Sequence, residues 1–566
     1  MNALFLVAAT VVAFVFGYRF YAKLLALEIF RLDPNYSTYA QSRPDGEDYV
    51  PTHPHLLLGH HVAAITGITA FAAPILALTW GWIPVFLWIT IGSTVAAGTY
   101  ALGSFWLSSR HPEDIGPLAR DLLGARARVA LRLLTVTALL ILVAASAGLA
   151  ATLLAAYPEA VLPTAAMALI AWLFGSYLHG RAESRLLPAS LVTLALALLS
   201  IWWLTDVPLV FAGQLTVSLG DSVHIVIDAV VVWVVLLLTY AFYSARAPVW
   251  KLMRPRGYLV ALALAVMLSL FYAAIIVRHP ILDAPEFHAP PSTVSALPWL
   301  FLVVGSGALA GWQLLIVRGV TGRELRRETD ARYVGYGAAL IQGLIALSAL
   351  LLAAIAFADR GAWSHYDGRG VADFPSAATF YIDQYTRLVA ALGLDPAFVR
   401  RFAATVLAGL SLAVLEAAVR ALKNTFIEIA PLPATPSRRH GQRSRLWPVV
   451  LGGGILALHD GRGLGGLALW PLLALSSLWI AAAGFALIGL ALRGARQPVQ
   501  LALAAATVVA VVAAWTTLAQ LWSWWQAQTW LGLGAGVVVC VLAGMLVGDA
   551  IAAARRPASV RPDAAP

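Results

Sequence analysis

Charged residues are scarce in this sequence. Asp, Glu, Lys and Arg make up 12% of the 566 residues, whereas hydrophobic residues make up 60%. A soluble globular protein is usually about 25% charged. Apolar runs long enough to span a bilayer recur from end to end, and the mean hydropathy is +0.80. The composition therefore excludes an ordinary soluble domain and predicts an all-α, polytopic membrane protein.

Cysteine and nucleotide-binding motifs are nearly or wholly missing. The single cysteine, Cys540, excludes an intrachain disulfide and a multi-cysteine metal cluster. There is no P-loop, no G-x-S-x-G and no phosphate-binding glycine motif between a strand and a helix, so we expect no enzyme activity. The net charge of +10 is explained by basic cytoplasmic loops, and we expect no nucleic-acid partner.

About fifteen spans are predicted when about 20 apolar residues are taken as the spanning length. They lie near 2–26, 59–80, 83–107, 128–156, 160–180, 186–204, 221–245, 257–278, 297–317, 334–358, 398–424, 446–460, 465–492, 500–521 and 531–553. No soluble domain is long enough to fold alone, and the longest polar stretches are 28–58 and 359–397.

The loops between the spans alternate between rich and poor in Lys and Arg. Because basic loops face the cytoplasm, one orientation satisfies nearly every loop, with the N-terminus outside and the C-terminus in the cytoplasm. The exception is 359–397, where arginines on the predicted outside are offset by aspartates.

Two predicted spans, 59–80 and 297–317, carry residues that interrupt helices. These residues are Thr66 and Gly67 in the first span and Ser306, Gly307 and Gly311 in the second. Small residues also let membrane helices pack closely, which is the alternative. We favour discontinuous helices, because unwound backbone at membrane depth must border protein or a water-filled cavity, and free N–H groups there suit an anionic group.

Ionisable side chains within spans are costly and are functional candidates. Glu416 and Arg420 lie four residues apart on one helix face, which predicts an internal ion pair of structural or functional use. Asp221, His224 and Asp228 would also share one helix face and form a proton relay. The alternative for Asp221 and His224 is a position at the water interface without any role.

A histidine pair, His60 and His61, precedes the first interruption. We interpret the pair as a gate or a proton-linked polar group. A hydrogen-bonded structural pair is the plainer alternative. A haem or metal site is a further alternative, but the spacing with His53 and His55 matches no standard ligand pattern, so we expect no cofactor.

Several ordered motifs resemble the carbon starvation protein A family of bacterial peptide and pyruvate transporters. They are GYRFYAKLLALEIFRLD at 17–33, DGEDYVPT at 45–52, GHHVAAITG at 59–67, PVWKLMRPRGYL at 248–259, ETDARYVGYGA at 328–338 and ALWPL at 468–472. The resemblance implies a fold similar to the amino-acid/polyamine/organocation superfamily, with two inverted five-helix repeats and broken helices.

The chain departs from the family pattern at polar positions within spans. Gln313 stands where the family has a histidine, and Gln342 stands where it has a glutamate. Around Glu416 the family's TTLDTATR becomes AVLEAAVR, which loses the hydroxyl groups that suit a bound sodium ion. Proton coupling through Glu416, or no coupling, is left.

Two functions are therefore considered. The first is a proton-coupled secondary transporter of a small organic anion or peptide, with pyruvate or peptides implied by the resemblance, in the bacterial inner membrane. The second is a non-transporting membrane subunit or anchor of a larger complex, for example a redox complex. The predicted organisation is an N-terminal span at 1–27, a cytoplasmic loop at 28–58, a transporter core at 59–492, further spans at 493–553 and a disordered tail at 554–566.

Overall fold

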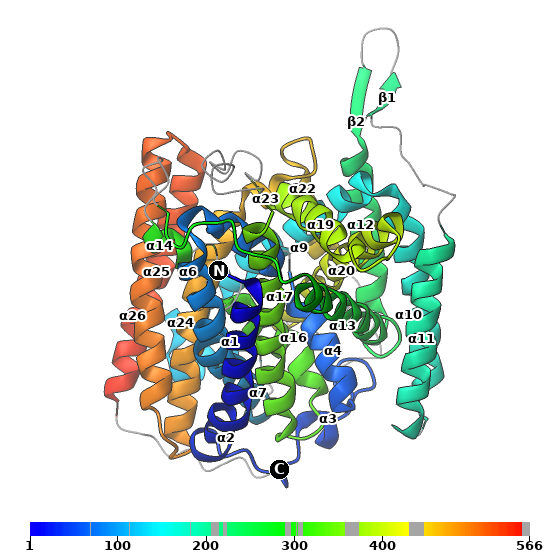
Figure 1. Cartoon of the computed structure of the whole chain (residues 1–566). Coiled ribbons are helices and arrows are strands. Elements are labelled where there is room, and N and C mark those ends of the chain that lie inside the picture. The colour runs from blue at the N-terminus through cyan, green and yellow to red at the C-terminus, as the bar shows by residue number, and fades with distance from the viewer. Residues whose placement is uncertain are drawn as a thin grey trace.

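The structure, a computed structural model, is a bundle of long helices with a small β-hairpin projecting from one end (Figure 1). It describes the chain except residues 68, 112–113, 182, 205–213, 219–223, 289–295, 302, 304–309, 357–372, 430–445 and 557–566. Within this part, 12 helices are long and apolar enough to cross a membrane, or 13 spans if a bent pair is counted as one. The protein is therefore a multi-pass, all-α membrane protein, as predicted.

The helices of the first half are α1 (Ala3–Phe16), α2 (Ala22–Leu24), α3 (Tyr39–Ser42), α4 (Pro54–Ile65), α5 (Thr69–Ala77), α6 (Trp82–Leu87), α7 (Gly98–Arg110), α8 (Ile115–Leu122), α9 (Ala125–Ala156), α10 (Val161–Leu178), α11 (Leu186–Trp203), α12 (Ala229–Arg246) and α13 (Met253–Arg278). Short π-helical segments at Gly17–Tyr21, Leu25–Ile29 and Trp88–Ala97 continue the first spans.

The helices of the second half are α14 (Ala296–Leu300), α16 (Gly311–Gly319), α17 (Gly337–Ala354), α19 (Phe374–Ala390), α20 (Pro396–Ile429), α22 (Leu446–Leu458), α23 (Gly465–Ala468), α24 (Trp470–Gly494), α25 (Gln500–Gln526) and α26 (Trp530–Arg555). A 3₁₀ turn, η8 (Thr321–Glu324), follows α16, and a π-helical turn, Arg332–Tyr336, precedes α17. The strands β1 (Gln214–Ser218) and β2 (His224–Asp228) pair antiparallel.

Three helices, α9, α20 and α24, form the interior. The most apolar stretches of α20 and α24 are 100% buried inside the protein, against 28% for α11 and 22% for α26 at the periphery. A helix that is hydrophobic all round suits such an enclosed position. Any charged side chain on α20 must therefore find its partner within the protein.

The first interrupted span is broken where the sequence predicts. Helix α4 ends at Ile65, α5 begins at Thr69, and the two helices are bent by 49°. Thr66 has φ −83° and ψ 75°, which is not helical. In the second interrupted span, α16 begins at Gly311, halfway along the predicted range 297–317, whereas Ser306 and Gly307 lie outside the described residues.

Two expectations about loops and spans are wrong. The polar stretch 359–397 contains α19, whose start is fixed by a capping box between Asp373 and Ser376 and which packs against α5 and α20. The predicted span at 221–245 begins only at Ala229, because His224–Asp228 is a β-strand with alternating Ile and Val. The count of about fifteen spans is not confirmed, since α22 has only 13 residues and 297–317 is partly outside the described residues.

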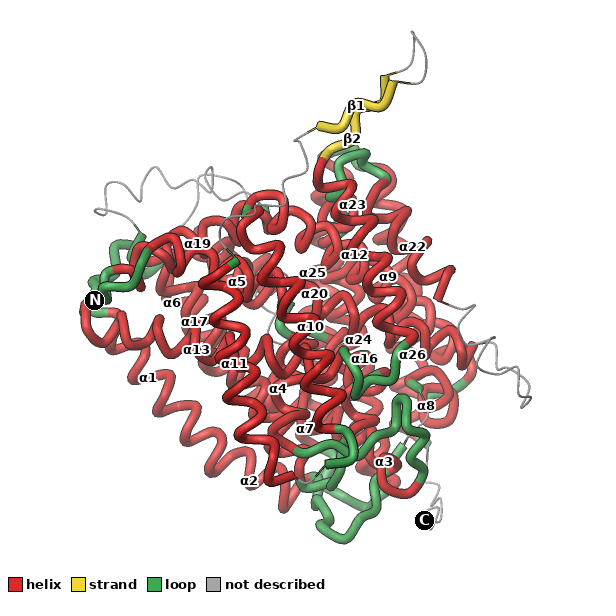
Figure 2. The backbone as a smooth tube through the Cα atoms, turned by 90° about the vertical axis from the view of Figure 1, so that its right-hand side faces the viewer, coloured by secondary structure: helices red, strands yellow, loops and turns green. Residues whose placement is uncertain are grey.

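The two ends of the bundle differ. Figure 2 shows loops gathered around α3 at one end, while the β1–β2 hairpin projects at the opposite end. Residues 45–52, which we call the strap, lie at the α3 end and pack on the turn between α12 and α13, where the Val249 N–H donates to the Glu47 carbonyl at 3.0 Å. The strap, which lies near the N-terminus in sequence, thus contacts residues about 200 positions later in the chain.

Candidate functional site

The helix break is held by a chain of neutral hydrogen bonds. The Gln342 side chain, on α17, donates from Nε2 to the Ile65 carbonyl at the end of α4, at 2.8 Å. Its Oε1 accepts from Gln313 Nε2, on α16, at 2.8 Å. Both glutamines are buried. Gln342 therefore links the end of α4 to the first turn of α16, so that the two predicted interruptions meet at one polar bridge.

The break also borders a small cavity. Its volume is about 10 Å³, room for about one water molecule. Its lining comes from α5, α9, α20 and the break itself, and comprises Thr66, Gly67, Phe71, Leu153, Leu407, Leu410 and Ser411. Within the described part of the chain, the buried Thr66 Oγ1 has no hydrogen-bond partner. A buried unpaired hydroxyl beside a cavity is suited to receive a polar group of a ligand.

Gly311 has a different environment from Gly67. A Cβ at Gly311 would collide with the backbone of α24 at Ser477, so this glycine serves close helix packing. A Cβ at Gly67 would lie 3.8 Å from the Trp312 ring, which is ordinary contact. The cavity thus lies beside the first break, whereas Gly311 packs against α24.

The two histidines have separate partners on the turn that follows α16. His60 Nε2 lies 3.3 Å from Glu324 Oε1, and His61 Nδ1 lies 3.0 Å from the Thr321 hydroxyl. Both imidazoles are 1% exposed. The other oxygen of Glu324 is 3.3 Å from Arg254 Nη1. Helix α4 is therefore tied to the α16–η8 segment near the α3 end as well as at the Gln342 bridge.

The charge on Glu324 is maintained by its neighbours. Burial by itself raises the pKa of this carboxyl, but His60, Arg254 and Arg420 outweigh burial and lower the pKa from its ordinary value. Glu324 is also held by the strap, because Thr52 Oγ1 donates to its Oε2 at 3.3 Å. One carboxylate therefore joins the strap, α4 and α13.

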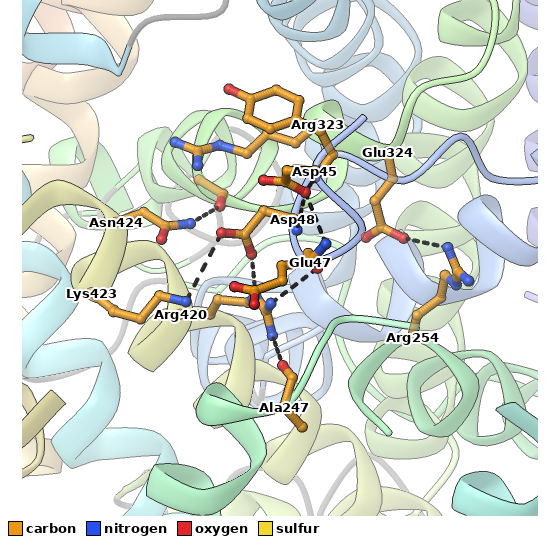
Figure 3. Close-up of polar contacts among 12 residues, drawn as sticks. Asp45, Glu47, Asp48, Ala247, Arg254, Arg323, Glu324, Arg420, Lys423 and Asn424 are labelled. Atoms are coloured by element: carbon orange, nitrogen blue, oxygen red, sulfur yellow. Dashed lines mark hydrogen bonds and ion pairs between the residues drawn. The ribbon is translucent and has the colours of Figure 1, made fainter. Parts of the chain in front are cut away.

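The strap is anchored by a charged cluster on α20, shown in Figure 3. Arg420 Nε donates to Asp48 Oδ1 at 2.7 Å, and Arg420 also donates to the carbonyls of Ala247 and Glu47. Lys423 Nζ lies 4.0 Å from Asp48 Oδ2. Burial opposes the charge on Asp48, yet Arg420, Lys423 and Arg323 lower the pKa of this carboxyl well below its usual range.

The predicted ion pair between Glu416 and Arg420 is wrong. Glu416 instead accepts from Arg256 Nη1, on α13, at 2.8 Å and from the hydroxyls of Tyr240 and Ser244, on α12, at 2.7 Å each. Both members of the Arg256–Glu416 pair are 1% exposed. On the enclosed α20, Glu416 thus contacts α12 and α13, while Arg420 contacts the strap. The two residues share a helix but do not pair with each other.

The predicted relay of His224 and Asp228 is not formed on a helix. Both residues are in strand β2, and the Asp228 side chain accepts from the Val230 N–H at 2.8 Å as the N-cap of α12. Asp221 lies outside the described residues. A helical spacing argument therefore does not apply to this group.

Metal ligation has no clear geometry here. Among the side chains that the structure describes, no group of three or more His, Cys, Asp and Glu could hold a metal ion. His60 and His61 are directed to different partners, Glu324 and Thr321. The expectation of no cofactor, and its haem or metal alternative, stay predictions.

Sequence reasoning missed three acidic residues that join distant segments, and two of them, Glu328 and Asp48, lie in the loop motifs. Glu328, in ETDARYVGYGA, accepts from both Arg110 and the Asp33 N–H, and thereby joins two motifs almost 300 residues apart. Asp48 and Glu324 act similarly for the strap. The available signal was that charged residues recur within these motifs, but the sequence does not indicate which ones pair.

The comparisons with known proteins agree with this picture. The family model described as carbon starvation protein CstA matches residues 2–364. The chain is 31% identical over 366 residues to a peptide transporter CstA of Mycobacterium tuberculosis, covering 63% of this chain and 47% of the relative. It is 30% identical over 365 residues to the pyruvate/proton symporter BtsT of Escherichia coli, covering 63% and 49%. The chain thus spans about half the length of the curated relatives it matches.

Solved structures show a weaker likeness. A crystal structure of MhsT in complex with L-phenylalanine has 13% identity and a TM-score of 0.47, covering 87% of this chain and 98% of that one. A manganese transporter mutant of Eremococcus coleocola has 12% identity and a TM-score of 0.41, covering 91% and 99%. These values do not establish a shared arrangement of spans, so the inverted repeats stay a prediction. The family match covers more than half of the sequence, and the chain belongs to the carbon starvation protein CstA family.

Proposed function

We propose that the chain is a secondary active transporter of a small organic anion or peptide in the bacterial inner membrane, driven by protons and linked to carbon starvation. Family membership supports the class, and the relatives named as a peptide transporter and a pyruvate/proton symporter suggest the cargo. The N-terminus would lie outside and the α3 end with the strap would face the cytoplasm, as the basic loops favour.

The observation that carries the proposal is the break between α4 and α5. It lies within the protein core, leaves Thr66 Oγ1 without a partner among the described residues, and borders a cavity. Irregular backbone at membrane depth is tolerated where it lines a protected cavity, and transporters place substrate sites at such breaks. The cavity as it stands admits only about one water, so the cargo would enter in a more open arrangement of the same helices.

We assign proton linkage to the His60–Glu324 pair. A proton on His60 turns its contact with Glu324 into an ion pair, whereas a neutral imidazole weakens the tie between α4 and the α16–η8 segment. The other charged groups around this pair are Arg254 on α13 and Arg420 on α20. Glu416 is less suited to the task, because Arg256 and two hydroxyl groups already hold its charge.

The test is uptake of pyruvate, and separately of a dipeptide, into proteoliposomes with and without a pH gradient. We expect the gradient to stimulate uptake by the unaltered protein. His60→Gln should abolish that stimulation while exchange of cargo across the membrane continues. His55→Gln is the matched control, since this exposed histidine contacts Tyr333 outside the pair.

Two outcomes would overturn the proposal. Stimulation that survives in His60→Gln would remove the proton role of this histidine. Absence of uptake for every cargo, together with a membrane protein that co-purifies in fixed ratio or a haem absorption band, would favour a non-transporting subunit of a larger complex.

A further inference from the structure

A second cavity lies far from the helix break, on the outer side of the bundle. It is a groove of about 440 Å³ between α10 and α11. Its walls are mostly apolar and include Leu173, Phe174, Val192 and Leu196, while Tyr177 and Arg185 lie where α10 ends and α11 begins. The groove is therefore apolar along most of its length and basic at one end.

The groove faces the bilayer. Helices α10 and α11 stand at the edge of the bundle (Figure 1), and the most apolar stretch of α11 is only 28% buried by the protein. Leu173 and Val192 are 54% and 60% exposed. In a spanning helix such side chains meet lipid chains, so acyl chains are the natural occupants of this groove.

The basic end of the groove holds three cations from two segments, the α10–α11 connection and the turn before α13. The Arg181 guanidinium lies 4.1 Å from the centre of the Tyr177 ring, Arg185 lines the groove, and Lys251 Nζ lies 5.9 Å from the centre of the Trp172 ring. Among the side chains that the structure describes, none of the three cations is in an ion pair with a carboxylate. This end of the groove therefore carries positive charge that no described acidic group balances.

The environment of these cations resembles a membrane interface. His179 stacks on Trp250 with ring centres 3.6 Å apart. In the sequence, His179 is two residues before Arg181 and Trp250 directly precedes Lys251. Aromatic rings and basic side chains gather at the level of lipid head groups, where each Lys or Arg near an anionic surface contributes about 1 kcal/mol. The basic end of the groove is thus expected at the level of the lipid phosphates in the bilayer.

We propose that this groove binds an anionic phospholipid. An acyl chain lies along Leu173, Phe174 and Val192, and the phosphate is bound by Arg181 and Arg185, with Lys251 nearby. A zwitterionic lipid has the same acyl chains, but its head group also carries a cation, which the basic end of the groove repels. A second copy of this chain would present apolar helices and leave the guanidinium groups unmatched.

The experiment is native mass spectrometry of the full chain released from detergent with added lipid. The unaltered protein should retain phosphatidylglycerol in preference to phosphatidylcholine, and free inorganic phosphate should not displace it. Arg181→Gln/Arg185→Gln should weaken retention of phosphatidylglycerol by roughly thirtyfold, about fivefold for each cation, and leave retention of phosphatidylcholine unchanged. Arg181→Lys/Arg185→Lys keeps the charge and should retain most of the preference.

A matched control removes two charges elsewhere. Arg19 and Lys23 are exposed near the α3 end on the first span, and Arg19→Gln/Lys23→Gln should leave the preference intact. Val192→Trp should fill the groove and weaken retention of both lipids without altering assembly of the chain. The proposal is overturned if both lipids are retained equally, if the control double variant has the same effect as Arg181→Gln/Arg185→Gln, or if the groove variant converts a dimer to a monomer.

Discussion

Two buried polar regions join distant parts of this chain, and they use opposite chemistry. The bridge at the helix break is neutral, with Gln313 and Gln342 sharing a hydrogen bond and Gln342 bonded to the Ile65 carbonyl. The strap end is ionic, with Asp48 on Arg420 and Glu324 between His60 and Arg254. The Arg256–Glu416 pair, one turn of α20 from Arg420, belongs to the same ionic region. Breaking a buried ion pair costs more than exchanging a neutral hydrogen bond. The molecule is therefore held firmly at the strap end and can rearrange more easily at the break.

The sharpest test of the ionic region is its most enclosed pair. Arg256→Met should destabilise the protein by about 3–5 kcal/mol, because it leaves the Glu416 carboxylate buried without its cation. Thermal unfolding in detergent, followed by tryptophan fluorescence, measures the loss. The double variant Arg256→Met/Glu416→Met should recover most of the stability, since both charges are gone. A single variant as stable as the unaltered protein would remove the distinction between the two regions.

The strap anchor should give the next largest effect. Arg420→Ala should cost about 2–3 kcal/mol, less than the Arg256 variant because Asp48 is 18% exposed and keeps Lys423 nearby. The control is Asn424→Ala, on the same helix as Arg420, which removes one hydrogen bond to the Gly319 carbonyl of α16 and should cost about 1 kcal/mol. Equal losses of unfolding free energy for the two variants would show that the ion pair stabilises the protein no more than one neutral hydrogen bond does.

The pH dependence of this anchor follows from the direction in which the pKa of Asp48 is shifted. The pKa of Asp48 is lowered in the folded protein, so its ion pair contributes fully above the unfolded value of 3.8 and is lost only as the pH falls through the lower folded value. The stability difference between the unaltered protein and Asp48→Asn should therefore be constant from roughly pH 5 to pH 6, below the range in which the neighbouring lysine titrates. A difference that changes within this range would assign a proton-sensing role to the strap instead of His60.

The neutral bridge should show the smallest loss of stability but a clear loss of transport. Gln342→Leu removes the donor to Ile65 and the acceptor for Gln313, at a cost of about 1–2 kcal/mol. Uptake into proteoliposomes should fall sharply, because the break is no longer held beside the cavity. Gln520→Leu, at a buried glutamine on the peripheral α25, should leave uptake unchanged.

The sequence predicts the spans well because hydrocarbon imposes a length and a composition on each of them. It also predicts the break at Thr66 and Gly67, where polar and small residues interrupt an apolar run. It fails for α19, whose amphipathic face is buried although the segment reads as a polar loop. It fails too for Glu416 and Arg420, because spacing along one helix says nothing about the helices α12 and α13 that supply closer partners.

The polar bridge illustrates a further limit of the sequence. Gln313 and Gln342 each depart from the family pattern, and the sequence treats them as two separate losses of a titratable group. The structure shows that they contact each other at 2.8 Å, so the two departures form one matched neutral pair. Such pairing depends on how α16 and α17 meet, which no local pattern encodes.

The central claim is that cargo occupies the cavity beside the break, and chemical labelling of Thr66 tests it most directly. With the single native cysteine removed by Cys540→Ser, Thr66→Cys should react with a small water-soluble thiol reagent in proteoliposomes. Saturating pyruvate, or a dipeptide if that is the cargo, should slow the reaction, whereas labelling of Ser42→Cys, at an exposed position of α3, should not change. A protein that transports its cargo while position 66 reacts at one unchanged rate would contradict the account.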